Sequence, residues 1–115
     1  MPCPFFLPEE PLDESGWAIP PRAPLGKAWA GLCCADRANP FRPDANALWT
    51  WCNFGYARGS CSQFPAGHTE DAVRFATVAG KLHWIIESAH VPVRFGQITE
   101  GTPEIVRKQA AAFRG

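Results

Sequence analysis

Residues 71–89, which read DAVRFATVAGKLHWIIESA, decide the fold class of this chain. In the first part of the stretch, larger side chains at every second position alternate with Ala72, Arg74 and Ala76. The larger side chains are Val73, Phe75 and Thr77. A period of two is typical of a half-buried strand. A turn with a glycine follows, and the chain then resumes with residues that favour strands. The pattern predicts a β-hairpin with strands over about 71–78 and 82–89.

The segments beside the hairpin extend this prediction. A third extended segment is expected near 91–99, with Pro92 on an edge or at the start of the strand, because proline cannot donate to a central ladder. A helix over 69–78 is the competing interpretation, since the polar residues from Thr69 to Asp71 could cap one. The alternation of side chains favours the strand.

The last residues predict a helix over about 103–113. Thr102 suits the N-cap, Pro103 suits the first helical position, and Glu104 favours the positive end of the helix dipole. Apolar residues then recur on one face: Val106, Ala110 and Phe113. A helix of this length is marginal alone, so we expect it to dock onto the hairpin or onto a partner.

Proline dominates the first half of the chain, with nine of the twelve prolines in residues 1–43. Each proline fixes φ and removes a main-chain donor, so long regular elements are not expected there. The segment also carries too much apolar surface to leave in water: Phe5, Phe6, Leu7, Trp17, Ile19, Leu25, Trp29 and Leu32. Such an arm must be fastened by hydrophobic packing and by a crosslink such as a metal.

Together these patterns predict an α+β fold with an irregular proline-rich N-terminal arm and cysteine-rich loop, a short antiparallel β-sheet and a C-terminal helix. Residues 1–115 are expected to form a single domain. Within it, residues 1–65 would be an irregular metal-binding half, and residues 66–115 would be the β-hairpin with the C-terminal helix.

Charge and hydropathy speak against several classes of protein. Eleven basic and eleven acidic side chains cancel, so the composition indicates no nucleic-acid partner. No apolar run approaches the roughly 20 residues that cross a bilayer. The start, MPCPFF, lacks the pattern of a secretory signal. We therefore expect a cytoplasmic protein without membrane attachment, whose thiols are kept reduced.

Five cysteines are a clear enrichment for a chain of this length: Cys3, Cys33, Cys34, Cys52 and Cys61. In a reducing compartment, metal binding explains such a set more readily than disulfides do. No C-x-x-C-type knuckle is present. Because neighbouring side chains of an extended chain point to opposite faces, one of Cys33 and Cys34 would be a ligand and the other a spectator. The pattern reduces to four widely spaced thiols.

Four thiolates suit either a Zn²⁺ ion or a [4Fe–4S] cluster, and three features favour the cluster. The dispersed spacing suits a larger object reached from four directions. Aromatic residues around the last two cysteines would limit solvent access: Trp49, Trp51, Phe54, Tyr56 and Phe64. Gly55 and Gly59 would let N–H groups approach the sulfurs, and Arg58 would offset negative charge. Zinc, a Cys52–Cys61 disulfide and inert buried cysteines are the alternatives.

No other motif points to catalysis. His68, His83 and His90 are each more typical of surface or hydrogen-bonded histidines. The chain lacks a nucleophile elbow, a C-x-x-C redox motif, a phosphate loop and a dinucleotide fingerprint. Cys61 with His68 is the one combination that would suit a thiol enzyme. We do not expect an enzyme, and we assign no catalytic residue.

The chain resembles a family of small, functionally uncharacterised bacterial four-cysteine proteins. The stretches that carry the resemblance are CPFFLP, PLGKAWAGLC, WCNFGYARGSCSQFP, AVRF and HVPVRFG, of which CNFGYARGSC is the most specific. The resemblance implies that the ligands are Cys3, Cys33, Cys52 and Cys61, with Cys34 an extra cysteine. A [4Fe–4S] protein that transfers electrons or senses redox state with a larger protein partner is the favoured function. A zinc-stabilised, non-enzymatic interaction module is the alternative.

Overall fold

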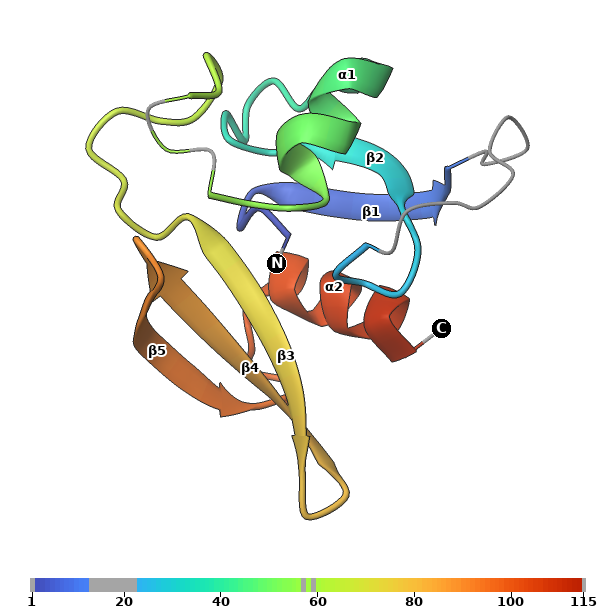
Figure 1. Cartoon of the computed structure of the whole chain (residues 1–115), viewed down its shortest axis with the longest axis vertical. Helices are drawn as coiled ribbons and strands as arrows, with labels where there is room; N and C mark the ends of the chain where they lie inside the picture. The colour runs from blue at the N-terminus through green and yellow to red at the C-terminus, as the bar shows by residue number, and fades with distance from the viewer. Residues whose placement is uncertain (1, 13–22, 57, 59, 115) are drawn as a thin grey trace.

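The computed structural model describes residues 2–12, 23–56, 58 and 60–114, and it shows two small antiparallel sheets with a C-terminal helix beside them (Figure 1). The elements in chain order are β1 (Phe6–Pro11), β2 (Trp29–Cys33), α1 (Ala45–Ala47), a π-helical turn η1 (Leu48–Cys52), β3 (Ala72–Val78), β4 (Lys81–Ser88), β5 (Val91–Gln97) and α2 (Glu104–Arg114). The predicted α+β class is confirmed.

The larger sheet has the order β3-β4-β5 and contains the predicted hairpin. Its register pairs Val73 with Ile86 and Phe75 with Trp84. Ala79 and Gly80 both have positive φ, 53° and 78°, which is the backbone of the two-residue turns that match strand twist. The competing helix over 69–78 is wrong, because β3 occupies most of that range.

Helix α2 contacts both β1 and β3, so it joins the two sheets (Figure 1). Val106 packs with Val73 and Ile86 in the buried core of the larger sheet. The predicted docking onto the hairpin is therefore confirmed. Thr102 was expected to cap the helix, but its hydroxyl accepts from the main-chain N–H of Thr99 (2.9 Å) and braces the preceding turn.

The N-terminal arm is more regular than its prolines indicate. β1 pairs with β2 in an antiparallel two-stranded sheet, with a register shift between Pro8 and Glu10. Each strand of such a sheet has one unpaired side, where the missing N–H of a proline costs no ladder bond, so prolines are tolerated there. At Gly31 the strands are so close that an added Cβ would lie 1.9 Å from the Leu7 carbonyl oxygen. Residues 13–22, with Trp17 and Ile19, lie outside the described residues.

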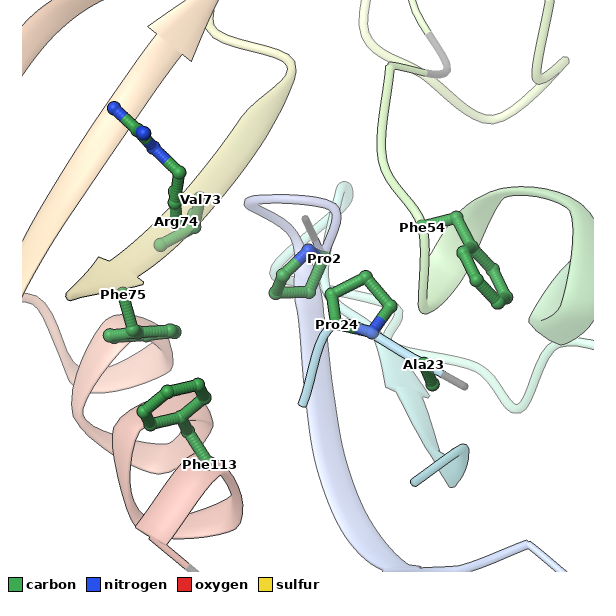
Figure 2. Close-up of a pocket in the computed structure, with 8 residues that line it drawn as sticks. All are labelled: Pro2, Ala23, Pro24, Phe54, Val73, Arg74, Phe75 and Phe113. Carbon is green, nitrogen blue, oxygen red and sulfur yellow. The ribbon is translucent and has the colours of Figure 1, made fainter. Parts of the chain in front are cut away.

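The two halves of the chain meet along a seam, which Figure 2 shows at close range. Pro2, Pro24 and Phe54 from the first half face β3 and the end of α2 across a cavity of about 440 Å³. On the far side Phe75 stacks on Phe113, with ring centroids 5.5 Å apart. The Pro2 carbonyl accepts from the N–H of Val73 (2.9 Å), which holds the start of the chain against β3.

Candidate metal centre

Four cysteines from four separate segments line one small cavity: Cys3, Cys33, Cys52 and Cys61. We call this arrangement the thiol cage. Its residues come from the arm before β1, the end of β2, the end of η1 and the irregular segment before β3. All four are half-buried free thiols. The cavity between them measures about 20 Å³, which is room for about one water molecule.

The adjacent cysteines at the end of β2 face different spaces. Cys33 lines the thiol cage, whereas Cys34 lines a separate groove. The main chain holds both positions: Cys33 exchanges hydrogen bonds with Phe41 (2.8 and 3.2 Å), and the Cys34 N–H donates to the Phe5 carbonyl (2.8 Å). This is the alternation expected of extended backbone. The ligand role of Cys33 stays a prediction, and its position is the one that the role requires.

Hydrogen bonds to the main chain fix the walls of the thiol cage. The Cys3 N–H donates to the Cys52 carbonyl (3.0 Å), which ties two of the cage segments directly. From α2, the Gln109 side-chain amide donates to the carbonyls of Cys3 (2.8 Å) and Phe6 (2.7 Å). These bonds are buried or partly buried, so each one holds its segment in a single position.

A second buried amide connects η1 to β2. Asn53, which is 1% exposed, accepts from the Trp29 N–H (2.9 Å) and donates to the carbonyls of Trp29 and Leu48 (both 3.0 Å). Its side chain therefore replaces a strand partner for Trp29 and also closes the helical turn. Cys52 is the preceding residue, so these bonds also help to hold its main chain.

Electrostatics make the thiol cage unfavourable for free thiolates. Burial, with smaller repulsions from the other cage thiols, raises the pKa of Cys3 and of Cys52 from 9.0 to about 12. Burial also raises the pKa of Cys33, and Cys61 adds to the shift. Every pair within the cage is close enough to interact. Burial and repulsion therefore oppose the thiolate forms of Cys3, Cys33 and Cys52, and a cation among them would favour those forms, as a metal centre does.

Main-chain hydrogen bonds from Phe5, Ala35 and Cys52 itself each lower the pKa of a cage thiol. The N–H of Phe5 donates to the sulfur of Cys3, and that of Ala35 donates to the sulfur of Cys33. Both donors are two residues after the cysteine that they bond. Such bonds favour the thiolate form and tune a bound metal.

The cage does not by itself present a finished coordination site. Within residues 2–12, 23–56, 58 and 60–114, no group of three or more His, Cys, Asp or Glu side chains is arranged to hold a metal ion. The four thiols share a cavity without converging on one point. A metal would require the cysteine side chains to turn towards a common centre.

The surroundings differ from those expected from the sequence. Trp51 and Phe64 do line the thiol cage, but Phe54 lines the seam, Trp49 stacks against Phe54 (6.5 Å between ring centroids), and Tyr56 points elsewhere. The apolar wall is completed by Phe5 and Phe6 of the arm. Their place directly after Cys3 and Pro4 was the signal that could have found them.

The expected role of Gly55 also needs correction. The Gly55 N–H donates to the Trp51 carbonyl (2.7 Å), and its φ of 75° ends the helical turn. It therefore serves the helix end rather than a cysteine sulfur. Gly59 lies outside the described residues. Arg58 is exposed and lines an outer groove beside Cys61, and it is not among the charges that shift the cysteine pKa values.

The histidines occupy positions outside the thiol cage. His68 packs edge-on against Phe5 (5.2 Å), and His83 lies on β4. His90, at a φ of 71°, stacks on Tyr56 with ring centroids 4.0 Å apart. The Tyr56 hydroxyl donates to Glu87, so this pair belongs to a polar cluster at the end of the hairpin.

Among the described residues, no helix is long and apolar enough to cross a membrane. Comparison with protein-family models, curated proteins and solved structures gives no match. The resemblance to small four-cysteine proteins therefore stays a prediction from the sequence.

Proposed function

We propose that this chain is a small iron–sulfur protein in which Cys3, Cys33, Cys52 and Cys61 hold a [4Fe–4S] cluster. The observation that carries the proposal is that these four thiols, from four separate segments, line one apolar-walled cavity. Thiolate ligands are those that such clusters require. When bound, the cluster would supply one-electron chemistry, in transfer to or sensing with a larger protein partner.

Three features of the surroundings support this proposal. The aromatic walls formed by Phe5, Phe6 and Trp51 would shield the cluster from water. The N–H groups of Phe5 and Ala35 would bond the ligand sulfurs and raise the reduction potential. Burial, with smaller repulsions between thiols, keeps Cys3, Cys33 and Cys52 protonated, so metal binding must release protons, as it does in other thiolate sites.

The zinc alternative is supported by one measurement, the volume of the cavity. About 20 Å³ is closer to the space of one ion than to that of an eight-atom cluster. A cluster needs the cage to widen, and both Cys3 and Cys61 lie outside the strands and helices. In the zinc case the protein would be an interaction module that needs the metal only for folding.

Purification without oxygen, followed by iron, sulfide and zinc analysis, tests the proposal. We expect a brown protein with four iron and four sulfide per chain, as the cluster's composition requires. A colourless protein with one zinc per chain contradicts the cluster and supports the alternative. A protein without metal contradicts both.

The ligand set is tested by a matched pair of variants at the end of β2. Cys33→Ser should remove the metal because Cys33 lines the cage, whereas Cys34→Ser should retain it because Cys34 faces away. The two substitutions are chemically identical and adjacent, so general destabilisation affects both. Loss of metal in Cys34→Ser alone would reverse the assignment.

A further inference from the structure

The groove that Cys34 lines has no part in the thiol cage. It has a volume of about 700 Å³, within the range of about 300–1,000 Å³ that is typical of small-molecule sites. Its walls come from both sheets and from the first turn of α2. We call it the Arg37 groove, after the cation on its rim.

The floor of the Arg37 groove is apolar. Leu7 of β1, Leu32 of β2, Ile86 of β4 and Val106 of α2 all contribute to it. Ile86 and Val106 are buried core residues, so the bottom of the groove is the outer side of the packed core. An apolar ligand body placed there would gain about 0.8 kcal/mol for each CH₂ removed from water.

The charges on the rim differ in whether they already have partners. Arg94 is held by Glu70 through two hydrogen bonds, of 2.7 and 3.0 Å. Arg37 and Glu104 also line the groove, and in the part of the chain that the structure describes neither forms an ion pair. The groove therefore presents one cation and one anion that a ligand could pair with.

Two features decide in favour of an anionic ligand. The guanidinium of Arg37 presents a planar set of donors that matches a carboxylate. The groove also contains the first turn of α2, whose dipole is positive at that end, although Glu104 opposes it. A cationic ligand would have only the carboxylate of Glu104 to pair with, without a second favourable feature beside it.

We propose that the Arg37 groove binds a small amphiphilic anion, with its apolar body on the floor formed by Leu7, Leu32, Ile86 and Val106 and its acidic group on Arg37. The proposal does not rest on a metal in the thiol cage, although Phe5 lines both cavities. A protein that proves to hold zinc, or no metal, leaves it unaffected.

Displacement of fluorescent anilinonaphthalene sulfonate from the purified protein tests the proposal. Three competitors share one chain length and differ in charge: octanoate, octanol and octylammonium. We expect octanoate to bind about fivefold more tightly than octanol, which is the effect of one partly exposed charge-assisted hydrogen bond. Octylammonium should bind most weakly. Equal binding of octanoate and octanol, or strongest binding of octylammonium, overturns the proposal.

Variants locate the charge that binds the anion. Arg37→Gln should remove the preference for octanoate over octanol and leave octanol binding unchanged. Arg42→Gln is the matched control, since Arg42 is also exposed but pairs with Glu9 (2.9 Å) outside the groove. Glu104→Gln should strengthen octanoate binding. If Arg37→Gln and Arg42→Gln behave alike, the assignment is wrong.

Cys34 provides a reporter of where the ligand lies. It is half-buried and lines the Arg37 groove, so bound octanoate should slow its alkylation by iodoacetamide, followed by peptide mass spectrometry. Octanoate that displaces the dye without protecting Cys34 would place the ligand elsewhere and contradict the proposal.

Discussion

The two halves of the molecule are held together by different means. The β3-β4-β5 sheet has an uninterrupted ladder between β3 and β4 and a core of apolar side chains under α2. The arm has short edge strands and relies on two buried amides, Asn53 and Gln109, which bond main-chain groups. A continuous core loses stability in proportion to the apolar area removed, whereas a region held by single polar side chains fails when one of them is lost.

Asn53→Ala is expected to lower the unfolding free energy more than any other substitution considered for the two halves. The substitution leaves the N–H and carbonyl of Trp29 buried without a partner and opens η1, which should cost about 3–4 kcal/mol of unfolding free energy. Urea denaturation of the metal-free protein measures the loss. Hydrogen exchange should show protection lost in β2 and η1 before β3 and β4.

Asn39→Ala is the matched control for this prediction. Asn39 is exposed and makes only a long side-chain contact to Asp36 (3.4 Å), so the loss should stay within about 0.5 kcal/mol. Equal losses for the two variants would mean that the arm does not depend on the Asn53 lock.

Val106→Ala should cause the next largest loss of stability, in the half that contains the β3-β4-β5 sheet. Val106 is 3% exposed and packs against Val73 and Ile86. Removing its two methyl groups should cost about 2 kcal/mol through lost burial and a cavity. Because α2 also contacts β1, protection from exchange should fall in both sheets.

Val93→Ala on β5 is the control for this prediction. Val93 is 49% exposed, so its substitution should lower the unfolding free energy far less. A selective loss of protection in the larger sheet would show that the halves are less coupled than the shared helix indicates.

The smallest expected effect concerns Tyr56, a residue of the first half whose side chain contacts Glu87 and His90 of the second half. Burial, followed by its hydrogen bond to Glu87, raises the pKa of Tyr56 from 10.0 to about 12. Because the folded state favours the protonated phenol, this contribution to stability is complete below pH 10 and is lost as pH rises towards 12.

Tyr56 is the only tyrosine, so tyrosinate absorbance in the near ultraviolet reports on it alone. Glu87→Ala should bring its pKa back towards 10.0, since both the hydrogen bond and the charge are removed. A wild-type value near 10.0 would contradict the contact between the halves at this point.

The difference between the halves also explains what could be predicted from the sequence. The β3–β4 hairpin was predicted to within a residue at each strand end, because its side-chain period and its turn are local properties. β1 was missed because Pro8 and Pro11 speak against a strand unless it is known to be an edge. The pairing of β1 with β2 is a tertiary contact between segments far apart in the sequence, so no local pattern could predict it.

The same limit applies to the candidate site. That the adjacent Cys33 and Cys34 face different spaces was predictable, since it follows from extended backbone. Which aromatics form the wall was not, because the directions of Trp49 and Trp51 depend on the helical turn from α1 through η1. The sequence therefore identified the thiols but not most of their neighbours.

The Gln109 contact has a consequence for how the protein is made. The cysteines all belong to the first part of the chain to be synthesised, but the carbonyls of Cys3 and Phe6 receive their side-chain donor from a residue near the end. On the ribosome, the reactive thiols therefore emerge well before the helix that secures their arm. Translation order thus creates an interval in which the nascent chain carries its cysteines without the Gln109 contact.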